Sequence, residues 1–248
     1  MTKRFIKGKN RECGFTLIEL LIVIAVLATV TGGIFLQLNT AQQRLSTEQV
    51  KVDNFDEARD FVDQFFRDIN QIGYPNGHMV NFLSPTLTTA QQDTRVAVGL
   101  VKIDGNAIWF EGDVGGTGVV QSVQYKVNGS GTCSVCLQRS AVPKVLGNPF
   151  TGQDTPGPVW GTEVNDVITN PIFTYYNTNG ATVAVPEDIN ANGPILATVK
   201  SIHINLTIQN NAIIDPKTKQ PIQTNFEGEI SLNNCSMATT GFVGISCQ

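Results

Sequence analysis

The chain has 248 residues, a formal net charge of −4, and charged side chains at only 15% of its positions. Its charge is uneven: residues 1–14 hold five of the 17 basic residues and one of the 21 acidic residues, which leaves twelve basic and 20 acidic residues in 15–248. The acidic body argues against nucleic-acid binding, which needs a basic surface facing the phosphates. The length suits one domain with an anchor, or two small domains.

A long apolar run follows the basic segment. No charged residue occurs from Leu20 to Gln43, and about 20 apolar residues are enough to span the hydrocarbon of a bilayer. The run continues through Thr31, Gly32 and Gly33 instead of ending at a small-residue cleavage site, so it is not typical of a secretory signal peptide. The basic flank predicts that the N-terminus stays in the cytoplasm. Composition alone leaves a plain N-terminal anchor open.

A helical pattern continues beyond this run. Apolar residues recur in steps of three and four at Phe55, Ala58, Val62, Phe65, Ile69 and Ile72, and Phe61 and Phe66 widen the stripe. The opposite face is predicted to carry Asp53, Asp56, Glu57, Arg59, Asp60, Asp63, Arg67 and Asp68. Gly73 and Pro75 end the pattern. We therefore expect one helix over about 15–72, on the order of 85 Å long, with Gly32-Gly33 as a flexible or melted point.

Alternating β-type runs occupy the rest of the chain. Strands are predicted over 94–103, 106–112, 118–129, 171–176, 197–210 and 227–234, with a hairpin turn at Asp104-Gly105 and a loop over 141–166. The run 197–210 alternates one apolar and one polar face, which is typical of an antiparallel sheet. The predicted fold class is α+β, a long N-terminal helix packed on an antiparallel β-sheet domain.

The segment "GFTLIELLIVIAVLA", which begins at Gly14 behind a short basic leader, resembles the class III signal of type IV prepilins and type II secretion pseudopilins. The resemblance implies that a prepilin peptidase cuts between Gly14 and Phe15 and N-methylates Phe15. Glu19 is expected to need a partner, because a carboxylate in lipid costs roughly 2.5 kcal/mol or more. The resemblance implies pairing with the Phe15 amine of a neighbouring subunit, whereas the residues alone leave a partner on the same chain open.

The resemblance also implies an organisation for the chain. Residues 1–14 would be a cleaved leader, 15–38 the transmembrane and filament-core helix, 39–73 its amphipathic periplasmic part, and 74–248 an extracytoplasmic β-rich domain. The subunit would sit in the bacterial inner membrane as a single-pass precursor and then enter a filament. Its implied partners are other pilins, the peptidase-methyltransferase, the inner-membrane assembly platform and, before assembly, lipid.

The element Arg67-Asp68-Ile69-Asn70-Gln71-Ile72-Gly73-Tyr74 is similar to a pattern in W-type minor pilins and J-type pseudopilins. A W-type minor pilin of a type IV pilus is therefore the first hypothesis. A J-type pseudopilin of a type II secretion system is the alternative, and a singly anchored periplasmic binding protein or adhesin is a second one.

Four cysteines lie beyond the leader, at Cys133, Cys136, Cys235 and Cys247. An even number in an exported domain predicts disulfides, and Cys133–Cys136 with Cys235–Cys247 is the simplest of three connectivities. A zinc site fits poorly, because eleven residues separate the second pair. A redox pair is also disfavoured, because such motifs usually begin a helix and this one lies between strand-like runs.

No cofactor is predicted, although the segment "DINANG" offers a calcium candidate at Asp188, Asn190 and Asn192. The twelfth position of such a loop should be a bidentate Glu and is Val199 here, so an Asx-rich turn is favoured. The two histidines, His78 and His203, lack neighbouring metal ligands in the sequence, and no nucleophile or nucleotide-binding motif occurs. The sequence therefore does not predict an enzyme.

Overall fold

The computed structural model describes residues 16–73, 99–128, 135–144, 157–196, 198–215 and 217–232. The chain divides into two compact units, Met1–Ser46 and Thr47–Gln248. The described part of the first unit is helical from Leu17 onward, and helix α1 (Leu17–Ile69, 53 residues) continues into the second unit. The helix is unbroken at Gly32-Gly33, where we expected a flexible or melted point.

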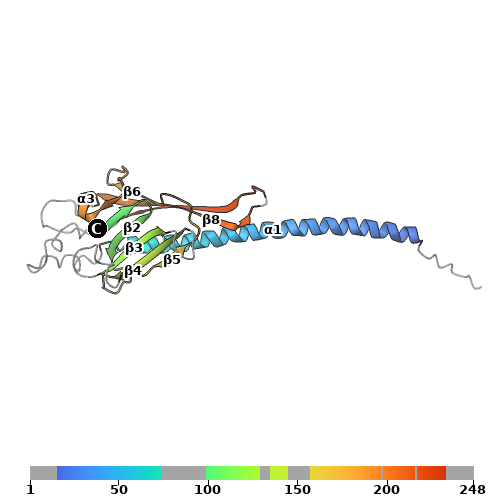
Figure 1. The fold of residues 1–248 in the computed structure, drawn as a ribbon, viewed down its shortest axis with the longest axis horizontal. Coiled ribbons are helices and arrows are strands. Elements are labelled where there is room, and N and C mark those ends of the chain that lie inside the picture. The colour runs from blue at the N-terminus through green and yellow to red at the C-terminus, as the bar shows by residue number, and fades with distance from the viewer. Residues whose placement is uncertain are drawn as a thin grey trace, which may run out of the picture. The chain divides into compact units, whose positions relative to one another are not determined.

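The second unit contains two antiparallel sheets, labelled in Figure 1. The six-stranded sheet has the order β5-β4-β3-β2-β1-β7, and the three-stranded sheet has the order β6-β8-β9. The strands are β1 (Leu100–Asp104), β2 (Ala107–Gly112), β3 (Gln121–Asn128), β4 (Cys136–Pro143), β5 (Gly161–Val164), β6 (Phe173–Asn177), β7 (Glu187–Asp188), β8 (Val199–Ile214) and β9 (Pro221–Ser231). A short helix, α3 (Ile189–Leu196), follows β7. The predicted α+β class, a long helix packed with antiparallel sheets, is confirmed.

One hydrophobic core joins the C-terminal part of α1 to both sheets. Phe65 is fully buried and contacts Tyr125 of β3 (ring centroids 5.2 Å apart) and Phe173 of β6 (5.5 Å). Burying a side chain of this size contributes about 1.5–3 kcal/mol. The alternation predicted for β8 is present, with Ile202, Ile204 and Leu206 fully buried.

The strand boundaries differ from the predicted ones in several places. Residues 141–166 are not all loop, because β4 extends to Pro143 and β5 pairs with it at the sheet edge. Neither the two-residue strand β7 nor α3 was predicted, and β8 extends to Ile214 while β9 begins as early as Pro221. These segments lack a clear apolar alternation, so their structure depends on pairing with distant strands. Residues 94–98, 129, 197 and 233–234 of the predicted strands lie outside the described residues.

The predicted hairpin between the first two strands is present, but its turn is displaced by one residue. Asp104 pairs with Ala107, so Gly105 and Asn106 form the two-residue loop. The Asp104 carboxylate accepts a hydrogen bond from the Asn106 N–H (2.9 Å), as in an Asx turn. Gly105 also packs against Pro171, so a Cβ atom there would lie 2.9 Å from the proline ring.

Candidate processing and assembly site

Glu19 lies in the first turn of α1, and Thr16 caps that turn. The Glu19 N–H donates to Thr16 Oγ1 (3.3 Å), and the Leu20 N–H donates to the Thr16 carbonyl (3.2 Å). The sequence Thr16-Leu17-Ile18-Glu19 has the spacing of a capping box, a local signal that our sequence analysis missed. A carboxylate in the first turn also interacts favourably with the helix dipole. Gly14 and Phe15 lie outside the described residues.

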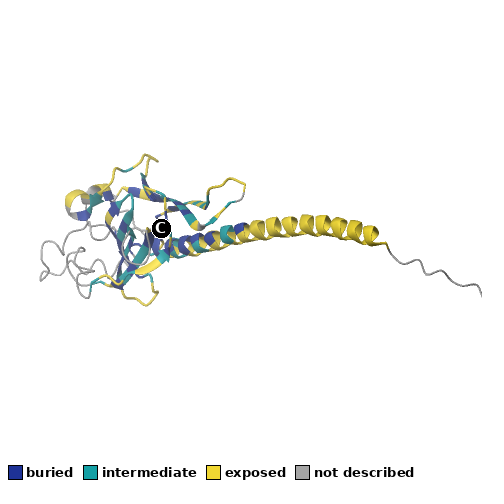
Figure 2. Ribbon diagram, turned by 45° about the vertical axis from the view of Figure 1, so that its right-hand side comes forward, coloured by how far each residue is buried: buried dark blue, intermediate teal, exposed yellow. Residues whose placement is uncertain are grey.

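The N-terminal half of α1 presents apolar side chains on all sides. Every residue from Thr16 to Ser46 is exposed, as the yellow part of the helix in Figure 2 shows. Leu17 is 80% exposed and Phe35 66%. In the described part of the chain, α1 is the one helix long and apolar enough to cross a membrane. Within the same residues no basic side chain forms an ion pair with Glu19.

The buried stripe on the C-terminal half of α1 differs from the predicted stripe at two residues. Phe55, which we expected to be buried, is 44% exposed. Asp68, which we placed on the charged outer face, is only 1% exposed. The stripe consists of Ala58, Phe61, Val62, Phe65, Asp68, Ile69 and Ile72, together with Thr47 and Asn54 nearer the N-terminus.

A buried polar cluster joins Asp68 to two strands. Asp68 Oδ2 accepts hydrogen bonds from the Tyr125 hydroxyl on β3 (2.7 Å) and from Arg139 Nε on β4 (2.7 Å). Its other oxygen, Oδ1, accepts from Gln64 Nε2 (2.6 Å). Burial raises the pKa of Tyr125 well above its ordinary value of 10.0, and the Asp68 charge adds to that increase. Of the two adjacent charged residues in the minor-pilin-like element, Arg67 is therefore exposed, whereas Asp68 is buried and joins the helix to the six-stranded sheet.

Just after α1 the chain crosses close to the six-stranded sheet, where two glycines allow the backbones to approach each other. Ile72 forms a β-bridge with Gly112, and the Gly73 N–H donates to the Glu111 carbonyl (2.9 Å). A Cβ atom at Gly112 would collide with the backbone carbonyl of Gln71. Gly73 has a φ of +73°, as expected for a residue that ends a helix. Tyr74, the last residue of the minor-pilin-like element, lies outside the described residues.

An ion pair lies next to this crossing. The Glu111 carboxylate on β2 pairs with Lys144, and the two side chains are 1% and 6% exposed. Burial raises the pKa of Glu111, and the attraction of Lys144 opposes that increase. Asp113, two residues further on, is held by the N–H groups of Thr117 (2.9 Å) and Gly118 (2.6 Å). Burial acts to raise the Asp113 pKa, but these backbone hydrogen bonds hold the pKa below its usual value of 3.8.

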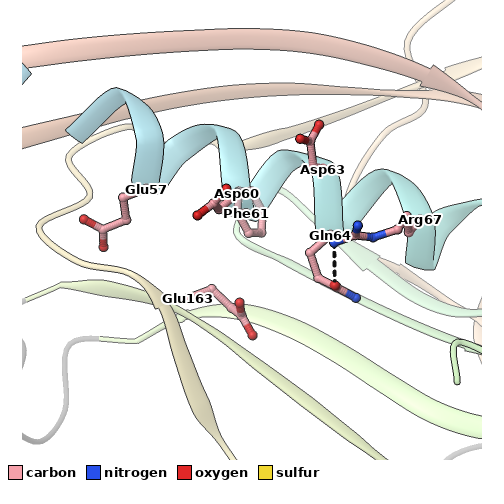
Figure 3. A pocket seen from close by; sticks show the side chains of 7 residues that line it. All are labelled: Glu57, Asp60, Phe61, Asp63, Gln64, Arg67 and Glu163. Atoms are coloured by element: carbon pink, nitrogen blue, oxygen red, sulfur yellow. Dashed lines mark hydrogen bonds between the residues drawn. The ribbon is translucent and has the colours of Figure 1, made fainter. Parts of the chain in front are cut away.

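An acidic groove of about 420 Å³ lies between α1 and β5. Figure 3 shows its lining side chains, which are Glu57, Asp60, Phe61, Asp63, Gln64, Arg67 and Glu163. Arg67 donates a hydrogen bond to Gln64 Oε1 (3.0 Å), and Arg59 Nε lies 3.9 Å from the Asp63 carboxylate. Among the described residues, no group of three or more His, Cys, Asp or Glu side chains is arranged to hold a metal ion.

Asp188, the first residue of the calcium candidate, has a structural role. Asp188 Oδ1 accepts a hydrogen bond from the Ala191 N–H (2.8 Å), which makes Asp188 the N-cap of α3. Asn192 Nδ2 donates to Glu187 Oε2. These contacts fit the Asx-turn interpretation. His203 lies half-buried in β8, on the polar face where it was expected, and His78 lies outside the described residues.

Cys136 is the one cysteine candidate among the described residues. It is fully buried at the first position of β4. Cys133, Cys235 and Cys247 lie outside the described residues, so none of the three connectivities is tested.

Residues 9–35 match the family model of the prokaryotic N-terminal methylation motif. Searches of the curated proteins and of the solved structures found no significant match. The matched segment includes Gly14, Phe15 and Glu19 and the beginning of the exposed apolar helix. Together with the long helix packed on antiparallel sheets, the motif supports a type IV pilin-like prepilin with a single-pass membrane anchor. The motif implies processing by a prepilin peptidase and assembly with other pilins.

Proposed function

We propose that the chain is a non-enzymatic structural subunit, a W-type minor pilin that enters a type IV pilus or a related filament. The observation that carries the proposal is the methylation motif at residues 9–35, which leads into a helix whose apolar residues are all exposed as far as Ser46. Such a surface needs lipid or other apolar helices around it. Lipid would surround it in the inner-membrane precursor, and neighbouring pilins would surround it in the filament.

Processing defines the start of the mature subunit in this proposal. The peptidase cuts between Gly14 and Phe15, removes leader 1–14, and methylates the new Phe15 amine. Residues 15–38 then form the filament core, 39–73 the periplasmic part of the helix, and 74–248 the β-rich body outside the cytoplasm. Disulfides among Cys133, Cys136, Cys235 and Cys247 belong to the proposal, and the buried, disulfide-bonded state of Cys136 supports them.

The cleavage step can be tested with a pair of Gly→Val variants. Gly14→Val places a branched side chain at the scissile bond, and we expect it to leave uncut precursor on a gel. The matched control, Gly8→Val, changes the leader but not the cut and should be processed normally. Mass spectrometry of the wild-type N-terminus should find N-methylated Phe15. An intact Met1 would contradict the proposal and support the singly anchored binding protein or adhesin.

Glu19 has two physical roles in this proposal, and one substitution separates them. Gln at the third helical position still suits a capping box but has no charge. If Glu19 pairs with the Phe15 amine of a neighbour, Glu19→Gln and Glu19→Val should both be cleaved and both fail to enter filaments. Filament fractions that contain the Gln variant at the wild-type level would refute the charge-pairing role.

The W-type and J-type alternatives differ in partners rather than in the chemistry of this chain. Co-purification of cross-linked filament complexes identifies those partners directly. Recovery of pilus subunits supports the minor pilin. Recovery of secretion-system pseudopilins supports the J-type alternative.

A further inference from the structure

The β8–β9 hairpin is held firmly along its length. The Gln209 N–H donates to the Asp166 carbonyl (2.9 Å), beyond the point where pairing with β6 ends. Val167 forms a β-bridge with Ile208, which is 3% exposed, and Ile222 of β9 is 2% exposed. The two strands run alongside α1 in Figure 1. The turn that joins them is therefore carried at a fixed place by well-attached strands.

The distal turn of this hairpin (Asp215 and residues 217–220) binds its own carboxylate. Asp215 Oδ1 accepts hydrogen bonds from the N–H groups of Lys217 (2.7 Å) and Thr218 (3.3 Å). The Lys217 N–H holds the pKa of Asp215 below its usual value of 3.8, and the charge of Lys51 on α1 adds to that decrease. The attraction between Asp215 and Lys51 places the distal turn near Lys51 of the helix.

The end of the hairpin presents two lysines and an isoleucine to solvent. Lys217 and Lys219 are exposed, and Ile214 is 57% exposed. In the described part of the chain, four basic side chains form no ion pair, hydrogen bond or cation–π contact, namely Arg44, Lys102, Lys217 and Lys219. Unpaired cations beside an exposed apolar side chain are typical of segments that lie on an anionic membrane surface.

The distal turn is close to the membrane-spanning part of α1 along the chain. The uncharged run from Leu20 to Gln43 has 24 residues. As a helix these residues span about 36 Å, whereas the hydrocarbon of a bilayer is about 30 Å thick, so Arg44 falls among the headgroups. Lys51 follows seven residues later, about 10 Å along a helix. Exposed charges act over about 8–10 Å at physiological ionic strength, so the distal turn is within electrostatic reach of the headgroups.

We propose that Ile214, Lys217 and Lys219 bind anionic phospholipid headgroups of the membrane that holds the anchor. The two ammonium groups attract the lipid phosphates, and Ile214 adds apolar contact at the boundary with the acyl chains. Residues 15–248 hold 12 basic and 20 acidic residues, so an anionic surface repels the chain as a whole and the attraction is local. The contact keeps the body of the precursor against the membrane until the subunit enters a filament. That consequence rests on the proposed function, whereas the lipid contact needs only the anchor.

Tryptophan quenching on the full chain in nanodiscs tests this contact. Thr218→Trp places a fluorophore in the distal turn, and the wild-type signal of the two native tryptophans is subtracted. The discs contain phosphatidylcholine alone or mixed with phosphatidylglycerol, and a lipid with a spin-labelled headgroup is the quencher. We expect stronger quenching of the introduced tryptophan in the phosphatidylglycerol discs. Equal quenching in the two kinds of disc would overturn the proposal.

A matched control places the same fluorophore at the other end of β8. Thr178 is exposed and follows Asn177, which pairs with Val199. Val199 is fifteen residues from Ile214, about 50 Å along a strand. Thr178→Trp should therefore not be quenched in either disc. Quenching of this variant to the same extent as Thr218→Trp would overturn the proposal.

Charge removal in the Thr218→Trp background identifies the cations. A lysine near an anionic surface contributes about fivefold in affinity, so Lys217→Gln/Lys219→Gln should weaken the contact roughly 25-fold and abolish the phosphatidylglycerol-dependent quenching. The control Lys102→Gln neutralises the other unpaired lysine, on β1, and should leave that quenching unchanged. Quenching that persists in the double variant, or is lost equally in the control, would overturn the proposal.

The result is independent of the tests of the proposed function, because insertion into a nanodisc requires neither cleavage nor assembly. A chain that is cleaved and assembled normally but shows no quenching of the distal turn overturns the lipid contact alone. Quenching of the distal turn in a chain that keeps Met1 in cells supports the lipid contact and overturns the proposed function alone.

Discussion

Replacing Asp68 by Asn tests whether the buried Asp68 carboxylate holds α1 to the six-stranded sheet. Asn keeps the shape of the side chain but removes the charge that accepts hydrogen bonds from Tyr125, Arg139 and Gln64. Breaking a buried ion pair by removing one partner typically costs about 3–5 kcal/mol. The Arg139 side chain is 21% exposed, so solvent recovers part of the hydration of its guanidinium. We therefore expect Asp68→Asn to lower the free energy of unfolding by about 3 kcal/mol, near the lower end of that range.

The assay is thermal or urea unfolding of the detergent-solubilised full chain. The chain has two tryptophans, Trp109 and Trp160, and both lie in the second unit, so their fluorescence reports on that unit. For a unit of this size, about 3 kcal/mol corresponds to a decrease of about 6–12 °C in Tm. The matched control is Asp63→Asn on the same helix, where the carboxylate is 60% exposed. It should change stability by less than about 0.5 kcal/mol.

A double-mutant cycle measures the interaction free energy of Asp68 and Arg139 separately from the other effects of the two substitutions. If Asp68 and Arg139 stabilise each other, Asp68→Asn and Arg139→Gln should be clearly less than additive. An Asp68→Asn variant as stable as the Asp63→Asn control would refute the argument, because the carboxylate would then not be holding the helix to the sheet.

Three further outcomes follow from the packing. Gly112→Ala places a methyl group against the backbone at the end of α1, so we expect a loss of more than about 2 kcal/mol in urea unfolding; near-wild-type stability would disprove the close crossing. Phe65→Ala should cost about 3–5 kcal/mol, whereas Phe55→Ala, at a residue 44% exposed, should cost much less; equal losses would contradict the corrected stripe. Burial raises the pKa values of Tyr125 and Tyr175 well above 10.0, so their contribution to stability is complete below pH 10 and is lost as pH rises through the raised values. Ultraviolet titration should show two of the four tyrosines ionising only as the protein unfolds, and four ionising together near pH 10 would contradict this.

Local sequence was enough to predict the helix and the type of fold. The three- and four-residue spacing from Ala58 to Ile72 matches the buried face, because helix periodicity depends only on near neighbours. The motif from Gly14 to Glu19 was identified from adjacent residues for the same reason, and the family match covers it. The capping box at Thr16 was equally local and was missed.

Tertiary structure decided the features that depend on distant partners. Nothing near Asp68 in the sequence shows that Tyr125 and Arg139, 57 and 71 residues away, would make its burial favourable. Phe55 fits the apolar stripe by spacing, yet it is 44% exposed, with its ring against Phe226 of β9. The four residues of β5 become a strand only because the edge of β4 is available to them. The sequence by itself therefore determined the helix, its anchor and its processing motif, which are local properties, while long-range packing decided which charged and aromatic side chains join the helix to the sheets.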